Sequence, residues 1–572
     1  MKPKLNNVQC LLHIVSAIIT NLFLVTFAIA APNLPDPANL PRFEEPTSAP
    51  VVTSPTIEKK DDSYPAALPE NLGIKITVDH LKFTGNKNVS DAVLTNLLKD
   101  YLGKSLSIKE LNQMTAMVTR YYRQQGFMLA QAYLPEQDID KNTLEIAIVE
   151  GYLGELKLNI KGKLDEVFLK KMASHDLASN DAIKESNLVR NITVINSLPG
   201  LQAASQMSPG QQIGYSDVDI GLEASPTFAG FLEANTFGNR FTGREVIGAG
   251  LFFNNLAGRG DRLSINLKAS NHEGQRAAQL GYILPVHESG TLLNLNVGYF
   301  DYHLGGQFSA LGVEGDSTYA SALLDQPLLR SRQGNITARA GVSYKDISDD
   351  VSAFSLENHR DINAIELGMF GDWRDGALGG FNQLGLNLKL GEVDFKDSFA
   401  EALDATGAKT SGGFVQYNIF ASRLQPLTAA YNLSVRGEYQ GANKNLDGTE
   451  KLAIGGVNRW REFGELPTSA DRGVIVGLEL RKTMSSLERL AGFLRSVEVS
   501  PYVFFDYGRG IINHSALSDS NHVNSSHYGL GVDTLITKKW ALGLAISHQK
   551  SQVEDTPSET ETRAWAQIQT QF

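Results

Sequence analysis

Residues that could do chemistry are scattered along this chain, and their spacing completes no catalytic motif. Gly103-Lys104-Ser105 has the ending of a phosphate-binding loop, but Leu98 stands where that loop needs glycine, so the run is interpreted as a helix end. His287-Glu288 lacks the second histidine of a zinc-peptidase helix. Cys10 is the only cysteine, and Gly258-Arg259-Gly260-Asp261 is interpreted as a hairpin turn. We therefore expect no enzyme activity, no metal site and no cofactor.

The composition excludes two further classes of protein. The 572 residues carry a net charge of −11 without a basic block, so a nucleic-acid partner is not expected. The mean hydropathy is −0.18. After residue 30 no run approaches the roughly 18 consecutive apolar residues of a membrane helix. A helical inner-membrane protein is thereby excluded, whereas a transmembrane β-barrel, whose strands alternate, is allowed.

Residues 1–30 have the pattern of a secretory signal peptide. Lys2 and Lys4 precede an apolar run over 11–30, and this run closes on the cleavage-site pattern Ala28-Ile29-Ala30. A membrane anchor is the alternative, because the run is long enough to span a bilayer. Polar residues inside the run favour cleavage. Since Cys10 lies in this segment, the mature protein would contain no thiol.

A proline-rich segment over 31–73 follows and is interpreted as an extended linker. It could include a short segment that plugs a channel. Pro35, Pro37 and Pro41 argue against a stable plug helix there, because proline interrupts helical hydrogen bonding.

Two compact units of similar design come next, over 74–151 and 152–225. In the first unit, an alternating strand from Ile74 to Phe83 precedes two helices, the second of which opens at Ser107, and then two strands. The second unit repeats the order β-α-α-β-β with weaker sequence echoes. Such a tandem resembles POTRA domains, the periplasmic modules of outer-membrane assembly and transport proteins.

From residue 226 the helical period gives way to strict alternation of apolar and polar residues. The segment 384–390, for example, places four leucines on one face and Gly385, Asn387 and Lys389 on the other. Strands with one apolar and one polar face are what a membrane barrel needs, and a sheet in lipid must close on itself. We expect residues 226–572 to form an outer-membrane β-barrel of about 16 antiparallel strands with a wet interior.

The last strand of this barrel is expected over 564–572, where apolar residues alternate with tryptophan and glutamines up to Phe572. A half-apolar strand that ends on an aromatic residue is typical of bacterial outer-membrane barrels. We expect it to pair with a first strand near 226–236. Phe572 is the predicted signal for insertion by the barrel assembly machinery.

Several stretches of the chain resemble two-partner secretion transporters of the ShlB/FhaC/HecB-like haemolysin secretion/activation family. They are Asn235–Gly243, Asn254–Ser264, Tyr282–Pro285 with Tyr302–Gly305, and Ile454–Phe463. The resemblance implies α+β POTRA domains followed by an all-β transmembrane barrel. It also implies a large secreted partner, such as an adhesin or haemolysin. The POTRA domains would capture this partner unfolded in the periplasm, and the barrel would export it without ATP.

The same resemblance implies a pairing inside the barrel between a returning extracellular loop and a strand. It assigns the loop arginine to Arg461 and the strand aspartate to Asp506, with supporting positions at Gly455, Gly456, Phe463, Phe504 and Gly508. Alternation over 499–506 places Asp506 on the polar, lumen-facing side, where a guanidinium could bind it through two hydrogen bonds. Alternatively, Asp506 is solvated by water and Arg461 is exposed. The chain departs from the family pattern at Trp460 and at Glu462, which could compete for Arg461.

The sequence thus predicts a two-partner secretion transporter of the bacterial outer membrane, with its POTRA domains in the periplasm and the membrane lipid around its barrel. One alternative is an assembly insertase of the same superfamily, whose members usually carry more than two POTRA modules. A second alternative is a porin or a nutrient receptor. Porins lack folded periplasmic modules, and nutrient receptors need about 22 strands.

Overall fold

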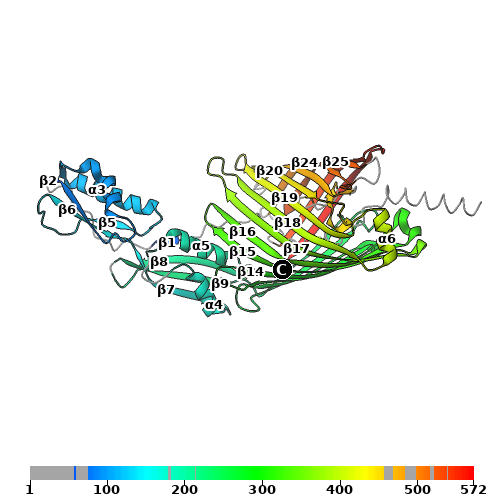
Figure 1. Ribbon diagram of the computed structural model, residues 1–572, viewed down its shortest axis with the longest axis horizontal. Coiled ribbons are helices and arrows are strands. Elements are labelled where there is room, and N and C mark those ends of the chain that lie inside the picture. Colours follow the sequence, from blue (N-terminus) through cyan, green and yellow to red (C-terminus); the bar gives the residue numbers. More distant parts are fainter. Residues whose placement is uncertain are drawn as a thin grey trace, which may run out of the picture.

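The computed structural model describes residues 57–59, 75–177, 182–212, 214–455, 461, 468–483, 497–515, 521–537 and 539–572. Two small α/β modules lie end to end on one side of the molecule, and a large barrel lies on the other (Figure 1). The predicted signal peptide and nearly all of the linker fall outside the described residues. In the described part of the chain, no helix is both long and apolar enough to cross a membrane.

The first module packs helices against a small sheet. Its elements are β2 (Lys75–Val78), β3 (His80–Thr84), α2 (Asp91–Leu98), η2 (Lys99–Tyr101), β4 (Lys104–Ser107), α3 (Ile108–Gln124), β5 (Gln131–Tyr133) and β6 (Thr143–Val149). Strands β3, β6 and β5 form one sheet, and β2 pairs with β4 in a second. Helix α3 begins as expected at Ser107: the Ser107 backbone N–H donates to Glu110 Oε2 at 2.7 Å, and the Glu110 N–H donates back to Ser107 Oγ.

Two local predictions in this module are wrong. The strand expected from Ile74 to Phe83 is divided after Val78, because β2 pairs antiparallel with β4 whereas β3 pairs parallel with β6. The run Gly103-Lys104-Ser105, interpreted as a helix end, instead leads into strand β4. The preceding helix already stops at Leu98, and η2 follows it. In both places the pairing partner decides the structure.

The second module has two helices over a four-stranded sheet. Its elements are β7 (Tyr152–Lys161), α4 (Glu166–Ala173), α5 (Glu185–Asn196), β8 (Leu201–Pro209) and β9 (Tyr215–Ala224). The sheet order is β1-β8-β9-β7, in which β1 (Ile57–Lys59) comes from the proline-rich segment and pairs parallel with β8. Fully buried leucine, isoleucine and methionine side chains from both helices and the sheet form its core.

Sixteen of the described strands that follow form one closed antiparallel barrel, as the sequence predicts. They are β10 (Phe228–Asn235), β11 (Val246–Asn254), β12 (Arg262–Ser270), β13 (Gln275–Pro285), β14 (Leu292–His303), β15 (Val313–Arg330), β16 (Gly334–Val351), β17 (Leu356–Arg374), β18 (Phe381–Phe395), β19 (Gly412–Pro426), β20 (Tyr431–Ala442), β23 (Arg472–Lys482), β24 (Glu498–Ile511), β25 (His522–Leu535), β26 (Trp540–Val553) and β27 (Glu559–Gln571). Strand β27 closes the ring against β10, with Gln571 opposite Phe231 and Gln567 opposite Asn235.

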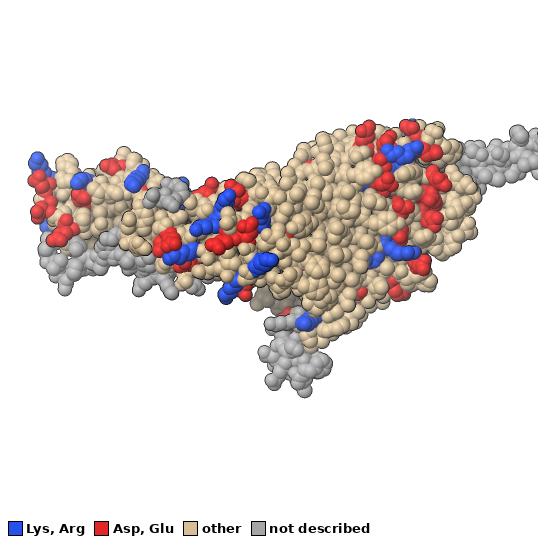
Figure 2. All heavy atoms as spheres, turned by 90° about the horizontal axis from the view of Figure 1, so that it is seen from below, with Lys and Arg blue, Asp and Glu red and all other residues tan. Residues whose placement is uncertain are grey.

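The outer wall of the barrel is apolar and its inner wall is polar. Leu384, Leu386 and Leu390 on β18 point outward and are 40–45% exposed, whereas Lys389, between them, is largely buried inside. On the face shown in Figure 2, charged side chains gather over the modules and at the far end of the barrel, and few lie on the wall between. This band is the surface that faces lipid.

The far end of the barrel, away from the modules, carries the longer connections. These include η3 (Asn271–Glu273), η4 (Gly306–Leu311), η5 (Ser352–Phe354) and α6 (Ser398–Thr406). The connection between β20 and β23 contains η6 (Gly448–Glu450), β21 (Leu452–Ile454) and β22 (Thr468–Ala470). Many of the described residues of this connection are buried, because they lie between the barrel walls.

Candidate functional site: the barrel lumen and its inserted loop

The structure brings Arg461 and Asp506 together inside the barrel. Arg461 Nε donates to Asp506 Oδ2 at 2.9 Å, and Arg461 Nη2 donates to Asp506 Oδ1 at 3.2 Å. Both residues are buried, with exposed fractions of 5% and 7%. Asp506 reaches the lumen because Phe504 and Asp506 share the inner face of β24, while Val503 and Phe505 face outward. The arrangement is a two-pronged, charge-assisted hydrogen bond.

Arg461 has a second carboxylate partner that the sequence analysis missed. Glu479 on β23 accepts from Arg461 Nη1 at 3.1 Å and also lies 3.0 Å from Arg481 Nη2. The Arg461 guanidinium stacks on the ring of Phe504, 3.8 Å from its centre. A signal for Glu479 was present, since it is the charged residue on the polar face of the alternating run 474–480. The competitor considered from the sequence, Glu462, lies outside the described residues.

The supporting glycines seat the loop against the barrel wall. Gly455 has φ +79°, a conformation that favours glycine, and its carbonyl accepts a hydrogen bond from Gln549 on β26. Gly508, on the same face as Asp506, leaves room for Ile454: a Cβ at Gly508 would lie 2.7 Å from Ile454 Cγ2. The predicted supporting residues Gly456 and Phe463, and the departure at Trp460, lie outside the described residues.

The first half of the loop is fixed by buried ion pairs that the sequence did not reveal. Asp447 Oδ2 accepts from Arg360 Nε of β17 at 2.5 Å. Glu450 lies between two lysines, 2.6 Å from Lys345 Nζ of β16 and 2.9 Å from Lys389 Nζ of β18. Burial opposes the charge of Asp447, but the neighbouring Arg360 outweighs it and lowers the pKa of this carboxyl to about 2. Asp447 is therefore charged at any physiological pH.

In the described part of the chain, one group of side chains could offer three metal ligands. Asp346, His359 and Asp361 have candidate ligand atoms within 4.8 Å of one another. His359 Nε2 already pairs with Asp346 Oδ1 at 3.1 Å, and Lys396 Nζ lies 2.7 Å from Asp361 Oδ2. A cation would have to compete with this lysine, so we interpret the group as an ion-pair cluster.

The junction of the two modules is organised by one buried carboxylate. Glu150 is 0% exposed and accepts from the backbone N–H and the side-chain amide of Asn88, both at 2.7 Å. Tyr122 and Tyr152 also donate to it, each at 3.1 Å. Burial and the charge of Glu150 raise the pKa of Tyr152 to about 12. These hydrogen bonds join the first module to the start of β7 in the second.

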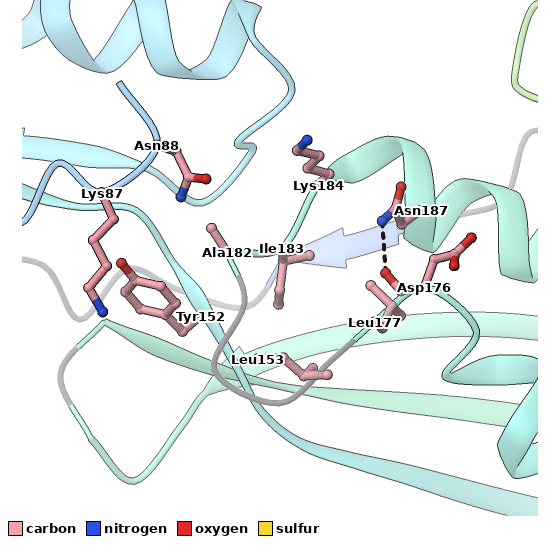
Figure 3. Close-up of a pocket in the computed structure, with 10 residues that line it drawn as sticks. All are labelled: Lys87, Asn88, Tyr152, Leu153, Asp176, Leu177, Ala182, Ile183, Lys184 and Asn187. Carbon is pink, nitrogen blue, oxygen red and sulfur yellow. Dashed lines mark hydrogen bonds between the residues drawn. The ribbon is translucent and has the colours of Figure 1, made fainter. Parts of the chain in front are cut away.

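Beside this network lies a cavity of about 360 Å³ lined by residues of both modules. Figure 3 shows Lys87 and Asn88 of the first module on one side and Ala182, Ile183 and Lys184 of the second on the other. Lys87 Nζ lies over the Tyr152 ring, 5.0 Å from its centre. The cavity is thus part of the contact between the modules.

Phe572 lies at the end of the barrel that faces the modules. Its backbone N–H donates to the Gly230 carbonyl and its carbonyl accepts from the Gly230 N–H, both at 3.0 Å. Its ring packs near Phe228, with 5.8 Å between the ring centres, and stays half exposed on the outer wall. The last residue therefore extends the β10–β27 seam.

Comparisons with known proteins agree with this architecture. Residues 214–532 match the family described as haemolysin secretion/activation protein ShlB/FhaC/HecB, and residues 76–151 match the ShlB-type POTRA domain. The heme/hemopexin transporter protein HuxB of Haemophilus influenzae (strain 86-028NP) is 25% identical over 538 residues, which cover 92% of this chain and 93% of that protein. The outer membrane transporter CdiB of Dickeya dadantii (strain 3937) is 23% identical, covering 81% of each chain.

A solved structure shares the fold. CdiB from Escherichia coli superposes with a TM-score of 0.70 at 19% identity, covering 89% of this chain and 93% of that one. Modules that resemble POTRA domains, joined to a sixteen-stranded barrel with an inserted loop, define an outer-membrane transporter whose POTRA modules lie in the periplasm. The chain belongs to the ShlB/FhaC/HecB haemolysin secretion/activation family. It is a two-partner secretion translocator, which exports a partner exoprotein through its barrel, rather than an assembly insertase.

Proposed function

We propose that this transporter exports one large secreted protein of the adhesin or haemolysin type. One relative is named a heme/hemopexin transporter; for this chain we keep the wider class of partner. The observation that carries the proposal is the loop held inside the lumen by Arg461 and Asp506, 2.9 Å apart, in a barrel that continues directly from the periplasmic modules.

In this proposal the modules capture the partner by adding its strand to an open sheet edge. Backbone hydrogen bonds along such an edge supply affinity for an extended chain without requiring one sequence. Strands β3 and β5 are the edges of the first module's main sheet. The partner then passes through the barrel, and its folding outside drives export. No catalytic step by this chain is involved.

The proposal also covers the regions and contacts that the sequence predicted. Residues 1–30 direct export to the periplasm, and 31–73 link to the POTRA domains at 74–151 and 152–225. Residues 226–572 form the barrel in outer-membrane lipid. Phe572, paired with Gly230 at the seam, is the contact proposed for the barrel assembly machinery.

Deleting residues 74–151 tests the capture step. The barrel is expected to remain in the outer membrane and to keep its heat-modifiable migration on gels, while the partner disappears from the culture medium. The matched control is the full chain with Arg276→Ala, a half-exposed barrel residue that pairs with Glu273 and is expected to have little effect. Export at the normal level by the deletion variant would contradict a role of the first module in capture.

A further inference from the structure

The second module covers only one side of the barrel mouth. Every hydrogen bond and ion pair that joins its described residues to a turn of the barrel falls on the β11–β12, β13–β14 or β15–β16 turn. We call these three turns the docked arc, residues 255–261, 286–291 and 331–333, and the next two, β17–β18 and β19–β20, the free arc, residues 375–380 and 427–430. In Figure 1 the second module lies beside β14 and β15, whereas β19 and β20 lie above, away from it.

Glycines bring the module so close to the docked arc that no other chain fits between them. Gly260 and Gly290 have φ of +86° and +92°. A Cβ on Gly260 would lie 2.8 Å from Leu198 Cβ, and a Cβ on Gly290 would lie 2.4 Å from Val194 Cγ1. Even a methyl group is too large for this contact, and neighbouring extended chains need about 4.8 Å between their backbones. The docked arc is therefore closed to a passing polypeptide.

Polar and apolar contacts hold the module in this position. The Asn255 side chain donates to the Gly200 carbonyl at 2.6 Å, and Arg190 Nη2 donates to the Ser289 carbonyl at 3.1 Å. Leu292, the first residue of β14, packs against the apolar core of the module. Opening the docked arc would break these hydrogen bonds and expose part of that core.

The free arc, in contrast, is exposed and holds its own shape. Leu378 is 70% exposed and Leu427 is 53% exposed. The Leu378 N–H donates to Asp375 Oδ1 at 2.6 Å, and the Tyr431 N–H donates to Thr428 Oγ1 at 3.1 Å. Both turns are thus closed by local hydrogen bonds, and neither needs the module to keep its conformation.

The inner wall beside the free arc is polar, and its side chains bond one another. Ser422 Oγ donates to Gln383 Oε1 at 3.0 Å, and Asn335 Nδ2 donates to Asp372 Oδ2 at 2.9 Å. Groups that already share hydrogen bonds gain little from bonding a passing chain, so this rim favours passage over tight binding. It fits an extended polar chain of no particular sequence.

We propose that the exported chain enters the barrel over the free arc, on the side of the mouth that the second module leaves uncovered. The partner that fits this opening is an unfolded, extended polypeptide. The proposal rests on the export function of the barrel and goes beyond it by assigning the side of entry. It does not depend on which sheet edge captures the partner.

Photo-cross-linking of a stalled partner in cells tests the side of entry. The partner carries a fused domain closed by disulfides, so that export stops with the chain still in the barrel. The full-length transporter carries one photoreactive benzoylphenylalanine in place of Leu378 or Leu427. The matched controls carry it in place of Leu256 or Val286, which lie on the docked arc and are 57% and 41% exposed. We expect several-fold more partner adduct at each position of the free arc than at either control.

Two results would overturn the proposal, with the four variants equally abundant in the membrane and the stalled partner co-purifying with each. One is as much adduct at Leu256 or Val286 as at the free arc. The other is no adduct at Leu378 and Leu427.

Failure of this proposal and failure of the proposed capture by the modules can be told apart. The cross-linking variants keep both modules, so they test only the side of entry. Deletion of residues 74–151 leaves the free arc unchanged and tests only capture. If the deletion variant still exported and still formed adducts at Leu378, the capture proposal would fail and the side of entry would stand.

Discussion

At the residue scale, one guanidinium, that of Arg461, ties the inserted loop to the barrel wall. Arg461 shares its donors between Asp506 and Glu479, and all three side chains are largely buried. Replacing Arg461 with Ala takes the guanidinium away from the buried Asp506, whereas Glu479 keeps Arg481 at 3.0 Å. The loss of one partner from such a buried pair costs about 3–5 kcal/mol. We expect Arg461→Ala to reduce export strongly, measured as the amount of partner in the medium, with the barrel still in the membrane.

The control for this variant is Arg276→Ala. Arg276 is half exposed and pairs with Glu273 at 3.3 Å on the surface, a kind of contact worth little. Normal export by Arg461→Ala, at equal abundance in the membrane, would mean that the lumen pair does not hold a functional loop.

The same residues show how far the sequence alone can go. The inward direction of Asp506 follows from alternation along one strand. Its partner could be identified only by resemblance, because the loop that carries Arg461 is far from β24 in the sequence. Asp447 and Glu450 were not predicted at all. Their partners Arg360, Lys345 and Lys389 belong to strands about a hundred residues or less away, and nothing local specifies which charges meet when a loop enters a lumen.

At the scale of elements, strand β1 is the least expected feature. The proline-rich segment was predicted to be an extended linker, yet Ile57–Lys59 adds to the second module's sheet in parallel with β8, with Ile57 opposite Ser205 and Lys59 opposite Met207. Three residues are too short a strand for alternation to be recognised, and the partner edge supplies what the local sequence lacks. The chain thus covers the β8 edge with its own backbone.

Deleting residues 57–59 should therefore expose the β8 edge. We expect faster hydrogen exchange of amides in peptides that cover 201–209, because part of their backbone bonding is lost, and unchanged exchange in peptides that cover β7. Mass spectrometry of the full-length variant and wild type provides the comparison. Identical exchange over 201–209 would mean that β1 does not protect this edge in solution.

The sixteen strands themselves were the most predictable elements, and the helices of the modules came next. A long run in which apolar and polar residues alternate leaves few alternatives to a β-strand. Closure of the sheet into a barrel then follows from the lipid environment. The division between β2 and β3 did leave a signal in the sequence. Apolar residues fall at 74, 76 and 78 and then at 81 and 83, so the alternation changes phase where the chain passes from one sheet to the other.

On the scale of the whole molecule, the second module is docked on the barrel through turns that the sequence presented only as hairpin tips. Arg259 at the β11–β12 turn binds Asp165, the N-cap of α4, at 3.0 Å and stacks over Phe168, 4.7 Å from its ring centre. The Asp165 N–H donates to the Gly258 carbonyl at 2.8 Å. Further contacts join Arg332 to Glu185 at 2.9 Å. The module is thereby fixed at the barrel mouth, where a captured chain must enter.

Arg259→Ala should weaken the contact between the second module and the barrel, but the module should stay bound to the barrel mouth. The ion pair is partly exposed, with side-chain exposed fractions of 40% and 28%, so its loss is worth about 1 kcal/mol or less, and the backbone contacts at Gly258 remain. We expect the module to sample a wider range of positions against the barrel.

Spin labels at Glu155→Cys in β7 and Leu378→Cys in the β17–β18 turn, both exposed, report this as a broader distance distribution. Arg276→Ala, at the other end of the barrel, is the matched control and should leave the distribution unchanged. A distribution as narrow for Arg259→Ala as for the control would mean that the backbone contacts alone fix the module, so that the transporter presents a rigid path from its periplasmic modules to the lumen.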